Sequence, residues 1–173
     1  MDIEEQLKTT YEKIGRNVYN YQILETGLKL LISRCIIHGN DPASLRENTK
    51  KNIDKQTMKT MGNLVKEYLD RIYEGKPVSN NSKILMQFTV EADEKFILDR
   101  KKELEKLVEQ RNHLVHQRLI ELDRASLSSC KKLCSELDEQ NEQIKCEFEI
   151  LRGQALSQIE MGNYIKQDAK KFM

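Results

Sequence analysis

The chain has 173 residues, enough for one domain with a sizeable core but too few for two. Charged residues make up 33% of it, aromatic residues 6%, and 7 glycines and 2 prolines leave few turn-formers, which favours a few long helices over a sandwich or barrel. The formal net charge of +1 excludes a global attraction to nucleic acid or to an acidic membrane, so RNA binding would need a local basic patch.

A long helix is predicted from Asp2 to Ile37. Apolar residues recur there at steps of three and four over about five heptads, a pattern typical of one wall of a bundle or of a strut between two subunits. The His-Gly-Asn-Asp-Pro sequence at 38–42 is expected to end it. The most apolar run, residues 28–37, contains Lys29 and Arg34 and is too short to cross a bilayer, so no membrane partner is expected.

The next part of the chain alternates between polar and apolar segments. Residues 43–57 are polar and rich in lysine, which predicts either a loop or a weak surface helix. Apolar residues at helical spacing predict a second helix over 56–73, and a cluster of Gly, Pro, Asn and Ser predicts the clearest break at 75–82. Alternating residues at 84–90 fit a short strand or an extended piece, and we interpret 78–90 as a loop or insertion.

Two further long helices are predicted in the second half of the chain. The third spans about 91–122, and Ser126 is a candidate N-cap for a fourth over 127–160. Gly162 and Asn163 are expected to interrupt this pattern before a frayed tail. The predicted fold is therefore a single all-α domain over 1–173, a bundle of four to five helices with a long N-terminal helix.

The cysteines indicate a reducing compartment. Cys130 and Cys134 are one helical turn apart and Cys146 is distant from both, so these three cysteines do not have the spacing of a zinc site. Cys35 stands alone, and the chain opens with no basic-then-apolar leader. We expect reduced thiols, a cytoplasmic protein, and neither a metal nor a cofactor.

Arg111 lies in the apolar stripe of the predicted third helix. At about 100° per residue, with Arg111 as zero, Leu104 and Leu122 fall near 20° and Val115 near 40°. A guanidinium on an apolar face is costly unless it is paired, reaches a cleft or meets an anion. It is therefore either a ligand-binding group or the partner of an acid from another helix.

Asn112 and His116 lie on the flank of the same face, at about 100° and 140°, and Glu109 lies beside them. A histidine there can move a proton near neutral pH, and an arginine can hold a phosphate with two parallel hydrogen bonds. His113 is further round, at about 200°. The alternative for His116 is a core histidine whose hydrogen bonds are satisfied.

The stretch Arg111 to His116 reads R-N-x-x-x-H and resembles the signature of the HEPN superfamily, all-helical domains that include many metal-independent ribonucleases. The motif stands near the end of a long amphipathic helix followed by another long helix. The helix pair over 91–160 fits the family best, and the two earlier helices would complete the bundle. The resemblance gives no expectation for residues 43–57 or for residues 78–90.

The resemblance implies a homodimer in which two motifs face each other across a cleft at the interface. Arg111 would hold the scissile phosphate, and His116 would act as general acid or base while the ribose 2′-hydroxyl attacks. The products would be a 2′,3′-cyclic phosphate and a 5′-hydroxyl, with no metal. Asn112 would orient the histidine or the phosphate. Such a protein would be a toxin or an anti-phage defence effector, with an antitoxin or a sensor protein as a possible partner.

Two features depart from the pattern. His113 is an additional histidine inside the motif, and with Glu109 we interpret it as adjacent to the substrate. HEPN toxins paired with a nucleotidyltransferase carry a tyrosine after the histidine, whereas Gln117, Arg118 and Leu119 follow here. Regulation by modification of such a tyrosine is therefore not expected.

The sequence also contains a small basic patch and is compatible with two alternative functions. Lys50, Lys51, Lys55 and Lys59 form either a solvated face or a contact surface for the RNA backbone. In the first alternative the protein is a non-catalytic HEPN-like scaffold whose Arg111 is a structural ion-pair partner. In the second it is a coiled-coil dimeriser built on residues 1–40.

Overall fold

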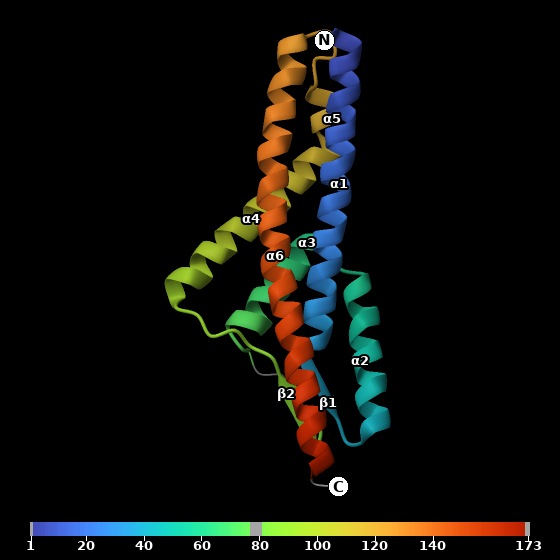
Figure 1. Cartoon of the computed structure of the whole chain (residues 1–173), viewed down its shortest axis with the longest axis vertical. Coiled ribbons are helices and arrows are strands. Elements are labelled where there is room, and N and C mark those ends of the chain that lie inside the picture. The colour runs from blue at the N-terminus through green and yellow to red at the C-terminus, as the bar shows by residue number, and fades with distance from the viewer. Residues whose placement is uncertain (1, 77–80, 172–173) are drawn as a thin grey trace.

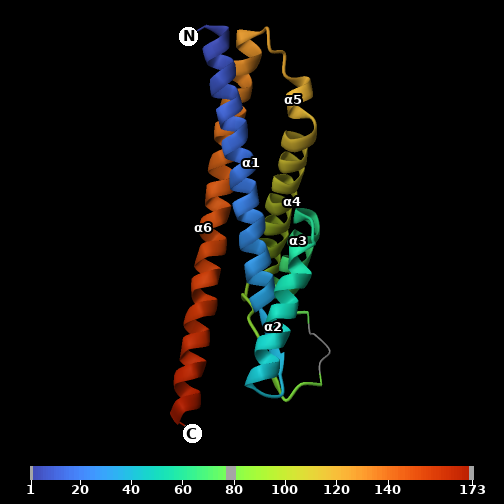
Figure 2. The ribbon, with the colours of Figure 1, turned by 90° about the vertical axis from the view of Figure 1, so that its right-hand side faces the viewer.

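The computed structural model describes residues 2–76 and 81–171, and it confirms the all-α class. Residues 77–80, which belong to the predicted break and insertion, lie outside the described residues. Two long helices, α1 (Ile3–Arg34) and α6 (Leu127–Lys171), run side by side in the same direction along the molecule (Figures 1 and 2). Within the described part of the chain, no helix is both long and apolar enough to cross a membrane.

Polar contacts at intervals along the seam set the register between α1 and α6. Asn17 donates from Nδ2 to the backbone oxygen of Leu137 at 2.7 Å, and Asn20 donates from Nδ2 to Oδ1 of Asn141 at 2.8 Å. Because a buried amide is costly without its partner, a shifted alignment of the two apolar stripes would leave these groups unsatisfied.

The first helix is shorter than the sequence pattern predicts. It ends at Arg34, and Ile36–Gly39 form strand β1, which pairs antiparallel with β2 (Ile84–Gln87) so that Ile36 faces Gln87. The β-branched residues of β1 fit a strand, and β2 supplies backbone partners that no local pattern reveals. The extended segment predicted near 84–90 is confirmed over residues 84–87.

Residues 42–57 form a helix, α2 (Pro42–Thr57), although they carry few apolar anchors. Asp41 caps it: Oδ1 accepts from the backbone N–H groups of Ala43 and Ser44, while Oγ of Ser44 accepts from the N–H of Asp41. Gly39 lies directly under this cap, since a Cβ there would be 2.8 Å from the backbone nitrogen of Leu45. Local hydrogen bonds therefore start a helix that its apolar pattern does not favour.

The predicted helix over 56–73 is interrupted. After α2 ends, the chain turns at Met58–Thr60 and continues as α3 (Met61–Tyr68), which passes into a π-helical turn, η1 (Leu69–Tyr73). The turn brings the hydroxyl of Tyr73 to the side chain of Gln154 on α6, at 2.8 Å. The wider turn thus links this segment to α6.

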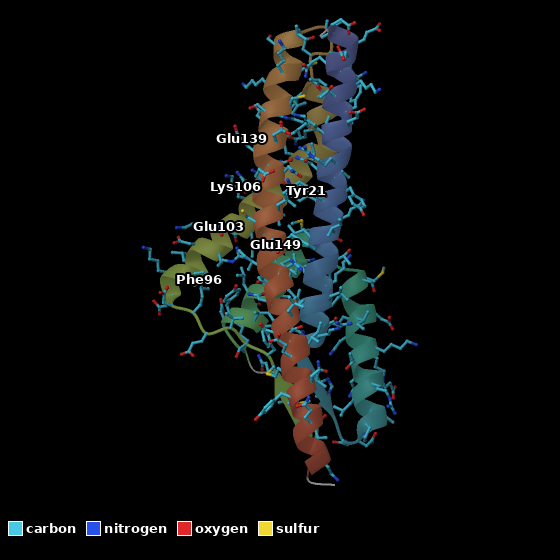
Figure 3. All side chains as sticks on the ribbon, viewed as in Figure 1. Tyr21, Phe96, Glu103, Lys106, Glu139 and Glu149 are labelled. Carbon is cyan, nitrogen blue, oxygen red and sulfur yellow. The ribbon has the colours of Figure 1, made fainter. Side chains whose placement is uncertain are left out.

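The motif-bearing helix, α4 (Glu94–His116), begins later and ends earlier than predicted. Asp93 caps its start, and the backbone leaves helical geometry at Gln117 (φ −126°, ψ −38°) before a single turn, α5 (Arg118–Glu121). Helix α4 crosses the molecule diagonally, with Phe96 at the end that projects from the body (Figures 1 and 3).

The last helix is longer than predicted, because α6 continues through Gly162 and Asn163 to Lys171. One glycine lowers helix stability by about 1 kcal/mol without removing a backbone hydrogen bond, so it does not stop a long helix.

A buried ion pair joins α4 to α6 beside the core. Both guanidinium Nη atoms of Arg100 donate to the carboxylate of Glu147, and the two side chains are 3% and 4% exposed. Burial alone would lower the pKa of Arg100, but the hydrogen bonds to Glu147 raise it above its ordinary value. The main core consists of buried apolar residues that come mostly from α1, α3, α4 and α6.

Candidate functional site

Arg111 lies on α4 between two buried residues, Leu107 and Leu114, and its side chain is still 32% exposed. Its Nη1 donates to Oδ1 of Asn112 at 3.0 Å, so Asn112 orients the guanidinium. Within the part of the chain that the structure describes, Glu25 of α1 is the one carboxylate in ion-pair range, at 4.0 Å from Nη2.

The contact between Arg111 and Glu25 is a weak one. It lies at the outer limit of ion pairing, and Glu25 has a closer partner in Lys29, at 2.7 Å. A partly exposed pair at that distance contributes little, about 0–1 kcal/mol. The guanidinium of Arg111 is therefore not neutralised by a close acid and can take up an anion.

His116 is the last residue of α4 and is exposed. Three apolar side chains next to it in sequence are also uncovered: Val115 at 42%, Leu119 at 42% and Ile120 at 85%. An ionisable side chain at a helix end among exposed apolar residues is the type of surface that a second protein chain or a substrate covers.

Arg111 and His116 occupy the same end of α4 but do not point the same way. They are five positions apart in the sequence, which corresponds to about 140° around a helix. One copy of the chain therefore presents the two groups on different flanks of α4. A phosphate that contacts both needs either a path around the helix or a second copy.

The remaining residues of the motif region face other neighbours. His113 lies on the α6 side, where its Nε2 is 3.0 Å from the carboxylate of Glu121 on α5. Glu109 lines a separate hollow of about 570 Å³ between α3 and α4. The structure thus keeps Arg111 and Asn112 in contact, whereas His113 and Glu109, about 40° apart around the helix, line different pockets.

The lysines of the predicted basic patch belong to another part of the molecule. Lys50, Lys51 and Lys55 are exposed on α2, with Lys51 paired to Glu47 at 2.7 Å, and Lys59 in the following turn is bound to Glu67. Both ribbon views show α2 and α5 in different halves of the molecule (Figures 1 and 2). The structure does not bring this patch to the motif within one copy.

Sequence patterns did not single out the polar contacts between α4 and α6. Arg100 falls in the same apolar stripe as Arg111, at about 340° when Arg111 is taken as zero. The argument that identified Arg111 could therefore have identified Arg100 as well. Glu147 stands between Ile144 and Leu151 in the stripe of α6. A pocket between these helices, lined by glutamines, carries no sequence signal.

No three His, Cys, Asp or Glu side chains of the described residues gather closely enough to hold a metal ion. Comparison of the chain with family models, with curated proteins and with solved structures gives no match. The resemblance to HEPN domains therefore depends on the motif and its setting.

Proposed function

We propose that the protein is a metal-independent endoribonuclease of the HEPN type, with Arg111 and His116 as its catalytic residues. The observation that carries the proposal is the state of Arg111: its guanidinium sits in an apolar stripe, stays one-third exposed and has no close carboxylate among the described residues. That state fits a group kept for an anionic ligand better than it fits the scaffold alternative, in which Arg111 is a structural ion-pair partner.

The chemistry follows from the two side chains. His116 takes the proton of a ribose 2′-hydroxyl, whose oxygen then attacks the adjacent phosphorus. Arg111 donates two hydrogen bonds to the phosphate oxygens and stabilises the added charge of the transition state. The bond to the 5′-oxygen breaks, and this oxygen receives a proton from a second acid. The products are a 2′,3′-cyclic phosphate and a 5′-hydroxyl.

A homodimer would bring Arg111 and His116 together in one site. A two-fold axis near the end of α4 would place Arg111 of one copy opposite His116 of the other. The exposed side chains of Val115, Leu119 and Ile120 would give such an interface an apolar centre. In this arrangement each site takes Arg111 from one copy and His116 from the other, the histidine acts as base, and a water molecule serves as the acid for the leaving oxygen.

The cell would need to control such an activity. An antitoxin or a sensor protein that covers the end of α4 would hold the enzyme off, as expected for a toxin or an anti-phage effector. All four cysteines are free thiols, which fits our proposal that the protein works in the reducing cytoplasm.

The test is RNA cleavage in the presence of EDTA by the wild type and by the Arg111→Ala and His116→Ala variants. We expect fragments with cyclic-phosphate ends from the wild type, and a loss of at least about 100-fold in each variant, the usual contribution of a general acid–base residue. Arg152→Ala, on the exposed face of α6, is the matched control and should cleave normally. Equal cleavage by all four folded proteins would refute the assignment.

A further inference from the structure

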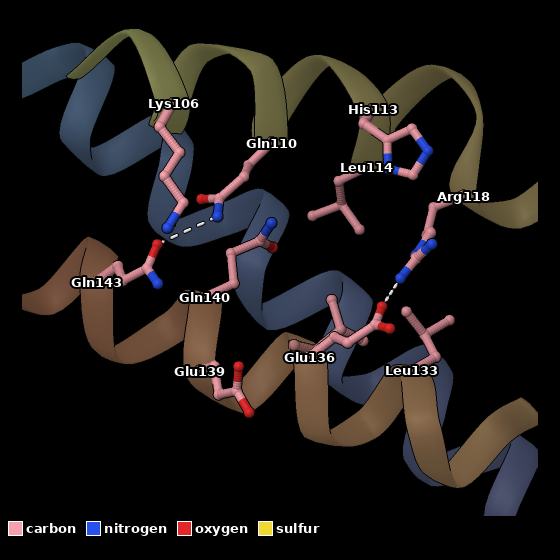
Figure 4. A pocket seen from close by; sticks show the side chains of 11 residues that line it. Lys106, Gln110, His113, Leu114, Arg118, Leu133, Glu136, Glu139, Gln140 and Gln143 are labelled. Atoms are coloured by element: carbon pink, nitrogen blue, oxygen red, sulfur yellow. Dashed lines mark hydrogen bonds and ion pairs between the residues drawn. The ribbon is translucent and has the colours of Figure 1, made fainter. Parts of the chain in front are cut away.

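A pocket of about 300 Å³ lies between α4 and α6 (Figure 4). Three glutamines define its polar wall: Gln110 from α4, and Gln140 and Gln143 from α6. Apolar side chains from both helices line the rest, namely Leu114, Leu133 and Leu137. A polar wall beside an apolar surface is the usual lining of a site for a flat, partly polar ligand.

Gln143 belongs to a chain of hydrogen bonds that begins on α1. The hydroxyl of Tyr21 donates to Oε1 of Gln110 at 3.2 Å, and Nε2 of Gln110 donates to Oε1 of Gln143 at 3.1 Å. Burial raises the pKa of Tyr21 well above its ordinary value, so this hydroxyl keeps its proton. The oxygen of Gln143 thus accepts from Gln110, and its NH₂ group has no partner among the described residues.

Gln140 is oriented in the same sense by a different partner. Its Oε1 accepts from Nδ2 of Asn17 at 3.0 Å, and that amide also donates to the backbone oxygen of Leu137 at 2.7 Å. Since a backbone oxygen can only accept, the orientation of Asn17 and therefore of Gln140 is fixed. Figure 4 shows Gln140 and Gln143 reaching from α6 toward α4. No other protein group in the described residues takes up their Nε2 hydrogens.

The charges around the pocket nearly balance. Lys106 stands at one end and Arg118 at the other (Figure 4), and Arg118 is bound to Glu136 and lies 3.6 Å from Glu121. A bare phosphate would meet both signs of charge there. A neutral group with several acceptor atoms matches the two free amide donors better.

We propose that this pocket binds one nucleobase of the RNA strand and prefers the keto bases, guanine and uracil. Guanine presents O6 and N7 and uracil presents O4 to amide donors, whereas the amino groups of adenine and cytosine would meet donors with donors. His113 lines the pocket one helical turn from His116, so a bound base would lie close to the scissile bond. The inference rests on the proposed ribonuclease function and names the part of the substrate that gives it selectivity.

The test measures binding of fluorescent 2′-O-methyl oligouridine and oligoadenosine, which lack the attacking hydroxyl. The wild type should bind oligouridine at least about fivefold more tightly, the lower range for a well-placed base contact. Gln140→Glu and Gln143→Glu each replace donors by acceptors in an almost unchanged shape, and should abolish or reverse the preference. Gln22→Glu, at an exposed position on α1, is the control and should keep it.

Each outcome separates this inference from the ribonuclease proposal. Cleavage by the wild type together with an unchanged base preference in both folded Glu variants would overturn the pocket and leave the ribonuclease. A preference that the Glu variants lose, without any RNA cleavage by the wild type, would support the pocket and overturn the nuclease. Equal binding of the two oligonucleotides by the wild type would overturn the pocket.

Discussion

Arg100 and Glu147 form the most deeply buried ion pair described in the molecule. Removing one partner leaves an unpaired charge in the core, so we expect Arg100→Met or Glu147→Leu to lower the free energy of unfolding by about 3–5 kcal/mol. The double variant Arg100→Met/Glu147→Leu removes both charges and should regain most of that loss. Urea unfolding of the four proteins measures this. Single variants as stable as the wild type would show that the pair is not formed in solution.

The reactivity of the four thiols tests whether the cysteines are buried as the structure shows. Burial raises the pKa of Cys35 to about 11, so near pH 8 this thiol stays protonated and reacts slowly. Cys130 and Cys134 are also buried, and Cys146 is exposed. Labelling of the native protein with a thiol-specific disulfide reagent should modify Cys146 rapidly and the others after unfolding. A fast phase that persists in Cys146→Ser would contradict this burial.

Part of this residue-level picture was accessible from sequence. Arg111 could be recognised because a charged residue in a helical stripe of leucines stands out. The sequence could not say that Glu25 lies at the limit of ion pairing, or that His113 turns toward Glu121. Those facts depend on which helices become neighbours. A periodic pattern shows which face of a helix is apolar, but it does not show which element packs against that face.

At the scale of elements, α2 depends on its cap. Asp41 satisfies two backbone donors at the start of a helix with few apolar anchors. Asp41→Ala should therefore lower stability by about 1 kcal/mol, and Asp41→Asn, which keeps a capping oxygen, by less. Thermal unfolding monitored by circular dichroism measures both. Equal stability of Asp41→Ala and the wild type would mean that packing on α1 alone holds the helix.

Helix interiors were predictable, whereas helix ends were less so. Long runs of apolar residues at steps of three and four identified most of α1, α4 and α6. The errors arose where a neighbouring element decided the outcome: β2 draws Ile36 and Ile37 into a strand, and the chain leaves the helix at Gln117 without a proline or glycine. The start of α2 had a readable signal in Asp41 and Ser44, which spacing of apolar residues does not detect.

At the scale of the whole molecule, the two long parallel helices α1 and α6 support α4, the helix that carries the Arg111–His116 motif. The buried Arg100–Glu147 pair ties α4 to α6, and Tyr21 ties it to α1 through Gln110. These contacts fix the helix that carries Arg111 and His116, while the apolar side chains of Val115, Leu119 and Ile120 near its end stay exposed. A site shared between two copies requires that the residues of each copy, here Arg111 and His116, be held rigidly while they remain exposed.

The most direct test mixes the two inactive variants, Arg111→Ala and His116→Ala, after mild dissociation and reassociation. Our account predicts that mixed dimers regain cleavage of RNA in EDTA, because one copy supplies Arg111 and the other His116 to one site. Each variant alone, treated in the same way, is the control and should remain inactive. No recovery in a sample in which mixed dimers are shown to form would contradict a site built from both copies.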